Sequence, residues 1–82
     1  MKITEDGLIS LITNALDADD VITLDSSMDN IPEWDSLGHL SILTSLDEAT
    51  EGKASSLSEL GDSTSVNAII SVLGKENLID ES

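Results

Sequence analysis

The amino-acid sequence predicts a small all-α domain. Apolar residues recur at helical spacing in three separate stretches, and residues that favour turns lie between them. The chain has 82 residues, which is enough for one domain with a single thin core. Hydrophobic residues make up 39% of the chain, but Trp34 is the only aromatic residue. The core must therefore consist mainly of aliphatic side chains.

The first helix is expected from about residue 4 to residue 16. Apolar residues fall there at i, i+3, i+4, i+7 and i+8, which is the spacing of one buried stripe. These residues are Leu8, Leu11, Ile12, Ala15 and Leu16. Thr4 can cap the helix, and Glu5 and Asp6 suit the positive end of its dipole.

A long first loop is expected from Asp17 to Asp35, because the helical period is lost and Pro32 interrupts any helix. Apolar residues nevertheless recur along it: Val21, Leu24, Met28 and Ile31. A loop of this length with spaced apolar residues is expected to be ordered and packed against the helices.

The second helix is expected to begin at or beside Ser36 and to run to about Glu51, with Gly52 as its stop. Ile42 accompanies leucines that repeat at three-residue steps: Leu37, Leu40, Leu43 and Leu46.

A short helix of one or two turns is expected around residues 57–60, before a glycine at position 61. The last main helix is expected from residue 63 or 64 to Gly74. Its buried stripe comprises Val66, Ile69, Ile70 and Leu73.

One domain is therefore expected over residues 1–74. Residues 75–82 are expected to form a frayed tail, with the alternative that Leu78 and Ile79 fold back onto the core. The first six residues turn acidic at once, unlike a signal peptide or a membrane anchor.

Charge excludes several classes of function. The chain has 17 acidic residues against three lysines and no arginine, for a formal net charge of −14. Such a surface repels nucleic acid and attracts basic protein partners. The longest aliphatic cluster, residues 68–70, is too short to span a bilayer. The absence of cysteine excludes disulfides and thiolate metal sites and is compatible with the cytoplasm, where we expect the protein.

Catalytic and metal-binding residues are not expected. His39 is the only histidine, so no second histidine or cysteine can complete a nucleophilic or metal site with it. The acidic first loop does not match a calcium-binding EF-hand in the registers that start at Asp17 or Asp25, because neither places glycine at the sixth position and glutamate at the twelfth.

The tripeptide Asp35-Ser36-Leu37 is the remaining candidate site. Asp and Ser before an apolar helix are ordinary capping residues. Here, however, the serine follows a long packed loop and opens an acidic amphipathic helix in a small domain without arginine.

With these residues the sequence resembles the acyl carrier protein family. The resemblance covers nearly the whole chain and centres on Asp35-Ser36-Leu37, with Trp34 just before and Leu40 three residues after. In this family the matching serine receives 4′-phosphopantetheine from coenzyme A, in a magnesium-dependent reaction of a separate transferase. The resemblance implies an acyl-carrier-like bundle of three main helices plus one short helix. It also implies that Ser36 is the attachment site.

The resemblance further implies a carrier function and a docking surface. The arm on Ser36 would hold acyl intermediates as thioesters in fatty-acid, polyketide or related biosynthesis, and the chain itself would be a monomer without enzymatic activity. Partners would be the phosphopantetheinyl transferase and acyl-loading, condensing or acyl-transferring enzymes with basic docking patches. The implied docking residues are Asp35, Leu37, Leu40, Asp47, Glu48 and Glu51. Two departures from the family are Ser41, where an acidic residue is common, and Ala49-Thr50, which lacks a bulky aromatic.

Two alternatives stay open. The first is an aminoacyl or peptidyl carrier, although such carriers usually have a glycine-rich, histidine-containing approach to the serine, where this chain has Asp35. The second is an acidic helical adaptor domain in which Ser36 only caps the second helix.

Overall fold

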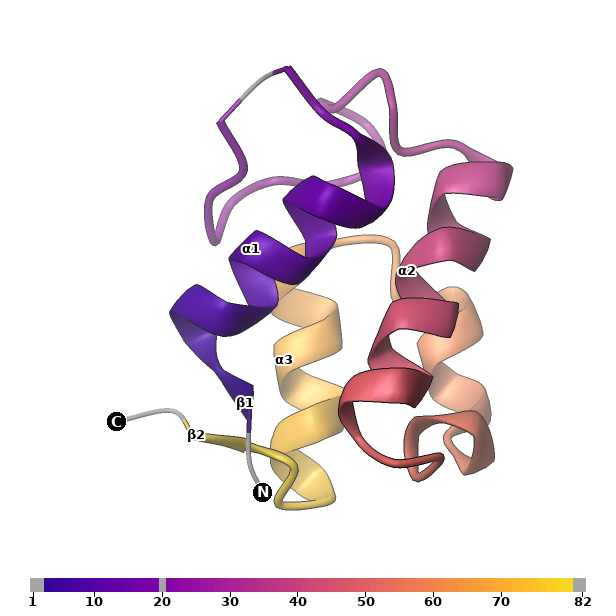
Figure 1. Cartoon of the computed structure of the whole chain (residues 1–82). Coiled ribbons are helices and arrows are strands. Elements are labelled where there is room, and N and C mark those ends of the chain that lie inside the picture. The colour runs from indigo at the N-terminus through magenta and orange to yellow at the C-terminus, as the bar shows by residue number, and fades with distance from the viewer. Residues whose placement is uncertain (1–2, 20, 81–82) are drawn as a thin grey trace.

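The computed structural model describes residues 3–19 and 21–80. Within them the chain forms three α-helices, two short 3-10 helices and two strands of two residues each (Figure 1). The predicted helical class is confirmed at this level. The elements are β1 (Ile3–Thr4), α1 (Glu5–Leu16), α2 (Ser36–Ala49), η1 (Ala54–Ser56), η2 (Ser58–Asp62), α3 (Val66–Lys75) and β2 (Ile79–Asp80).

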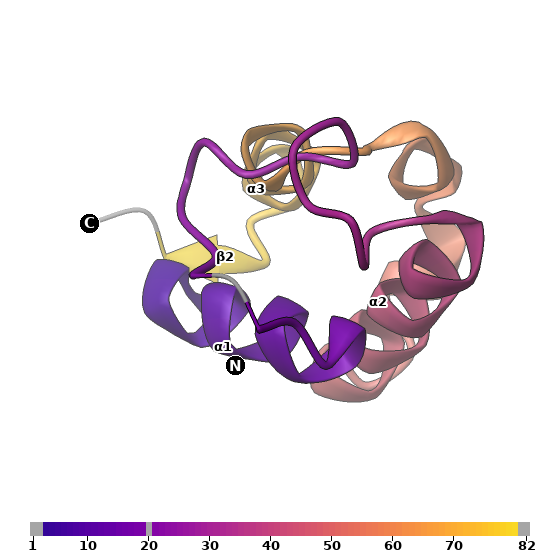
Figure 2. The same cartoon turned by 90° about the horizontal axis from the view of Figure 1, so that it is seen from above.

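The three α-helices surround one core, and the loop between α1 and α2 passes over one end of it (Figure 2). The side chains buried most completely come from all three helices and from the segments that join them: Leu8, Ile12, Trp34, Ile42, Leu46, Leu60, Val66, Ile69 and Leu73. No helix in the described residues is both long enough and apolar enough to cross a membrane.

Local sequence signals account for both ends of α1. The Thr4 side chain accepts a hydrogen bond from the Gly7 N–H at 2.9 Å, so the predicted cap is confirmed. The helix ends where Asp17 adopts a left-handed conformation with φ of 51°. Of the predicted stripe, Leu8, Ile12 and Leu16 are buried, whereas Leu11 and Ala15 pack at its margin.

The first loop is pinned by its backbone to the start of α3. The Met28 N–H donates to the Thr64 carbonyl at 2.8 Å, and the Val66 N–H donates to the Ser26 carbonyl at 3.0 Å. The predicted packing is confirmed for Ile31, which is buried.

The prediction is wrong for Val21 and Leu24. Val21 is 82% exposed and Leu24 is also exposed, while Ile22 is buried instead. Irregular backbone has no fixed period, so spacing alone could not decide which of two adjacent β-branched residues faces inward.

Helix α2 begins at Ser36 as predicted and ends at Ala49, two residues before the predicted end. Its leucines do not form one buried stripe. Each residue turns the helix by about 100°, so four leucines at three-residue steps spread over about half of its circumference. Leu46 is buried, whereas Leu37 and Leu40 are exposed.

The last helix begins later than predicted. Ser65 is its cap and accepts a hydrogen bond from the Ala68 N–H at 3.1 Å, so α3 starts at Val66 rather than at residue 63 or 64. It also continues past Gly74 to Lys75. The expected short helix is present as the 3-10 helix η2, and a second 3-10 helix, η1, precedes it and was not predicted.

The C-terminal segment folds back instead of fraying. Asn77 adopts a left-handed conformation with φ of 58°, which turns the chain after α3. Leu78 and Ile79 are buried, and the Ile3 N–H donates to the Leu78 carbonyl at 3.0 Å. The expected frayed tail is therefore wrong up to Asp80, and the alternative, in which Leu78 and Ile79 fold back onto the core, is confirmed. Residues 81 and 82 lie outside the described residues.

Candidate functional site

Ser36 is the first residue of α2, and its side chain is exposed. The residue before it, Asp35, is the cap: its carboxylate accepts a hydrogen bond from the Gly38 N–H at 2.8 Å. Because Asp35 satisfies the capping requirement, capping does not explain why a serine stands at position 36.

A buried chain of hydrogen bonds supports the turn that presents Ser36. Trp34 is 1% exposed, and its indole N–H donates to Nδ1 of His39 at 3.1 Å. Nε2 of His39 lies 2.9 Å from the Leu60 carbonyl oxygen. An indole can only donate, so Nδ1 must accept and Nε2 must carry the proton that is donated to Leu60.

These bonds tie three separate segments together: the residues before α2, the first turn of α2, and η2. Both ring nitrogens of His39 are engaged, so this histidine is not available as a base for Ser36. From the sequence, His39 was considered only as a possible catalytic or metal residue, and this role was not predicted. One sequence feature could have indicated it: the only tryptophan and the only histidine of the chain lie on either side of Ser36.

Gly38 allows the preceding segment to pack closely on the first turn of α2. A Cβ atom at this position would clash with the carbonyl oxygen of Glu33 and would lie 2.7 Å from Cδ2 of Leu16. Any larger residue must push the segment away, and this segment carries Trp34 and Asp35.

The electrostatics at Ser36 favour an anion more than the net charge of the chain suggests. The first turn of a helix has backbone N–H groups without intrahelical acceptors, and the helix dipole places positive potential there. The first turn of α2 contains no acidic residue, in contrast to α1 with Glu5 and Asp6. A phosphate group on the Ser36 oxygen would therefore meet favourable dipoles, beside one carboxylate at Asp35.

Two hollows adjoin Ser36. One, of about 460 Å³, lies on the side of the first loop and is lined by residues from Met28 to Ser36. The other, of about 360 Å³, lies between α2 and η2 and includes Leu40, Leu43 and Gly61 in its lining. A group attached to Ser36 thus has two recesses within reach.

The structure does not bring the predicted docking residues together on one surface. Leu37 is 74% exposed and Leu40 is 58% exposed, and both line one shallow hollow on α2 together with Glu48. Asp47 is half-buried and lines a different pocket, between α2 and η1. Glu51 is exposed in the turn after α2.

The structure places Ser41 on the surface of α2 and buries Thr50 just after the end of this helix. Ser41 is exposed and lines the same hollow as Leu37 and Leu40, so the middle of this surface carries hydroxyl groups rather than charge. Thr50 is buried, and its hydroxyl donates to the Leu46 carbonyl at 2.7 Å while it accepts from the Ala54 N–H at 2.9 Å.

In residues 3–19 and 21–80, no group of three or more His, Cys, Asp or Glu side chains is placed to hold a metal ion.

Comparison of the chain with models of protein families, with curated proteins and with solved structures finds no match.

Proposed function

We propose that this chain is an acyl carrier protein with an acyl-carrier-like helical bundle, and that Ser36 carries 4′-phosphopantetheine. The observation that carries the proposal is the exposed Ser36 at the first position of a helix that Asp35 already caps. The buried bonds of Trp34 and His39 hold this exposed hydroxyl on a fixed support.

The local chemistry suits a phosphodiester at the Ser36 oxygen. The transferase would supply the base and the metal ion, so the carrier needs no base of its own. Its residues would hold the phosphate at the N-terminus of α2, where unpaired N–H groups and the dipole oppose the negative charge of the surroundings. The terminal thiol of the arm supplies the point at which an acyl group is held as a thioester.

We further propose that Leu37 and Leu40 contact the partner enzymes close to Ser36, while Glu48 and Glu51 attract their basic patches. Exposed leucines lie beside a modifiable serine, while Glu48 lies near the other end of the same helix and Glu51 in the turn after it. This arrangement fits a partner that combines an apolar contact with cations. In this proposal the protein is a monomeric, non-enzymatic, cytoplasmic carrier in fatty-acid, polyketide or related biosynthesis.

Intact-mass measurement tests the proposal directly. The protein is incubated with coenzyme A, magnesium and a broad-specificity phosphopantetheinyl transferase. The wild type should gain one phosphopantetheine, Ser36→Ala should gain none, and the control Ser41→Ala should be modified like the wild type. Circular dichroism should show that both variants keep the helical spectrum. Modification at another serine, or none with several transferases, would reject the carrier function.

An aminoacyl or peptidyl carrier would give the same mass change, so loading by acyl- and aminoacyl-transferring enzymes must separate these two functions. The adaptor alternative required Ser36 to act as the cap of α2. In the structure the cap is Asp35, so nothing in the helix geometry requires a serine at position 36.

A further inference from the structure

We infer that His39 is a proton-sensitive support of Ser36: protonation of its ring releases Trp34 and loosens the segment that precedes α2. The ring makes two hydrogen bonds. Nδ1 accepts from the indole N–H of Trp34 at 3.1 Å, and Nε2 lies 2.9 Å from the carbonyl oxygen of Leu60. Histidine is the side chain that ordinarily changes its charge between about pH 5 and 8. The protonation state of the ring therefore decides which of these two bonds can exist.

Only the neutral ring can accept the bond from Trp34. An indole has a single N–H group and can only donate, whereas an imidazolium carries N–H groups on both nitrogens and has no acceptor. Rotation of a protonated ring therefore cannot restore the bond. Trp34 is 1% exposed, so its N–H group would be left buried without an acceptor, which is costly.

The relative position of the two rings also opposes a positive charge on His39. The rings lie within 16° of parallel and their centroids are 6.2 Å apart, so they meet edge to edge along the hydrogen bond. The edge of an aromatic ring carries partial positive charge, and a cation is attracted to the face instead. An imidazolium at this position therefore repels the edge of the Trp34 indole.

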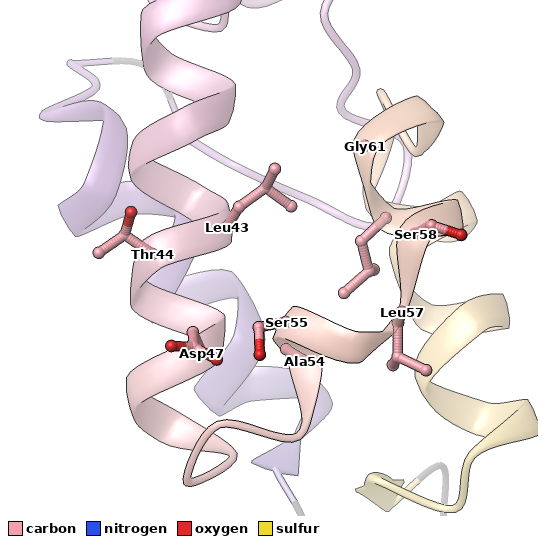
Figure 3. Close-up of a pocket in the computed structure, with 9 residues that line it drawn as sticks. Leu43, Thr44, Asp47, Ala54, Ser55, Leu57, Ser58 and Gly61 are labelled. Atoms are coloured by element: carbon pink, nitrogen blue, oxygen red, sulfur yellow. The ribbon is translucent and has the colours of Figure 1, made fainter.

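The bond to Leu60 responds in the opposite way. Nε2 donates to the Leu60 carbonyl in the neutral ring, and a charged donor makes such a bond stronger. Apolar side chains also hold η2 on α2, because Leu60 is buried and Leu43 extends from α2 toward η2 (Figure 3). Protonation thus keeps His39 bound to η2 and loosens only the segment before α2.

The recess beside the first loop gives the released indole a place to move. Trp34 lines this recess, which has a volume of about 460 Å³ and is lined by residues from Met28 to Ser36. Water in the recess can accept the hydrogen bond that His39 no longer accepts. Because Asp35 and Ser36 directly follow Trp34, the same movement changes how the Ser36 hydroxyl is presented.

Charged groups on the elements around His39 can also titrate and must be separated from it. Among the described residues, the ring nitrogens bond to Trp34 and Leu60 and to no carboxylate. The Asp35 carboxylate is held by the Gly38 N–H at 2.8 Å. The charged side chains on the first loop, before α2, in η2 and at the end of α3 are Asp29, Glu33, Asp35, Glu59, Asp62 and Lys75, of which Glu59 and Lys75 pair with each other.

The release of Trp34 does not require that Ser36 carries any group. The unmodified protein is therefore the sample for the test, and the result is separate from that of the mass measurement. A protein that gains no phosphopantetheine would reject the carrier function and leave the response of Trp34 to protonation unchanged.

A titration from about pH 8 to pH 5 measures this response. The ring protons of His39 and the indole N–H of Trp34 are followed by NMR. Trp34 is the only aromatic residue, so fluorescence reports on its surroundings alone. We expect the indole resonance to shift and the emission to move to longer wavelength, both with the midpoint of the His39 ring protons. The helical circular-dichroism spectrum should stay constant, because the change is local.

Two variants assign the transition to His39. Glutamine in His39→Gln can accept from the indole and donate to the Leu60 carbonyl, but it does not titrate. The indole resonance and the emission of this variant should therefore stay constant over the same pH range. Asp35→Asn removes the neighbouring carboxylate, keeps an oxygen that can cap α2, and should show the wild-type transition.

An indole resonance that does not follow the titration of His39, or a ring that gains no proton down to about pH 5, would overturn the inference. The same transition in His39→Gln, or its loss in Asp35→Asn, would assign the change to a carboxylate and reject a role of His39. If His39→Gln does not fold, the agreement or disagreement of the midpoints in the wild type decides. Loss of the helical spectrum at that midpoint would show global unfolding and contradict a local release of Trp34.

Discussion

Gly38 illustrates how one missing side chain positions the candidate site. It lies in the first turn of α2, where a Cβ would clash with the Glu33 carbonyl oxygen and press on Leu16. Alanine favours helices over glycine by about 1 kcal/mol, so local propensity alone predicts that Gly38→Ala stabilises the protein. Packing predicts the reverse, because overfilling a close contact costs about 1 to 3 kcal/mol.

We therefore expect Gly38→Ala to lower the free energy of unfolding by about 1 kcal/mol or more, measured by urea denaturation. The control is Gly61→Ala, because a Cβ at Gly61 would meet no atom within 4 Å. That variant should be neutral or slightly more stable. A Gly38→Ala variant as stable as the wild type would show that the segment before α2 can move away from the helix without cost.

The structural role of His39 could not be predicted from the residues near it in the sequence. The sequence excluded a catalytic constellation because it offers no second histidine or cysteine. It could not show that His39 bridges Trp34 and Leu60, since Trp34 precedes the helix and Leu60 follows 21 residues later. Contacts at such separations depend on the packing of α2 against η2, and no local spacing encodes that packing.

At the scale of elements, the starts of α1 and α2 were predictable because each depends on one local cap, Thr4 or Asp35. The start of α3 was not, because Ser63, Thr64 and Ser65 are consecutive candidates for the cap. The backbone pairing of Ser27 with Ser65 fixes the choice, and this pairing joins distant parts of the chain. The position of Ser36 was thus predictable, but the separation of Asp47 from the surface of Leu37 and Leu40 was not.

Glu48 near the end of α2 and Glu51 in the turn after it are exposed, as are Leu37 and Leu40, and this leads to a test of docking. The double variant Glu48→Lys/Glu51→Lys should slow modification by the transferase at low salt by about tenfold, because charges at the rim of an interface act mainly on association. Its rate should also depend less on ionic strength than that of the wild type. Both residues are exposed, so the thermal stability should change little.

The matched control is Asp6→Lys/Glu76→Lys, which changes the net charge by the same amount at exposed positions of other segments. This control should keep most of the wild-type rate. If the two double variants are slowed equally, the partner senses the total charge, and α2 has no special role in docking.

For the molecule as a whole, negative charge is expected to limit stability. The net charge is −14, and the ion pair between Lys75 and Glu59, at 3.2 Å, joins two exposed side chains and contributes little. Folding brings the carboxylates closer together, which opposes the compact state. A domain of this size has only a few kcal/mol of net stability, so a change of 1 kcal/mol shifts the Tm by about 4 to 8 °C.

Added salt should therefore raise the Tm of the unmodified protein. If general screening of the carboxylates is the cause, NaCl and MgCl₂ at equal ionic strength should raise the Tm by similar amounts. Differential scanning calorimetry can compare the two. A clearly larger rise with magnesium would indicate local binding between carboxylates, and no rise with either salt would point to the thin core as the limit.

The parallel pairing of β1 with β2 also has a topological consequence. Ile3 lies opposite Ile79 and Thr4 opposite Asp80, at the end of the molecule far from the first turn of α2 (Figure 1). Because the two strands run in the same direction, a linker from residue 80 to residue 3 must turn back along the pair, which is only two residues long, to close the chain into a ring. New ends could then be opened at the exposed turn of Gly52 and Lys53. If the original, linear chain is immobilised on a surface through β1 or β2, Ser36 will face the solution.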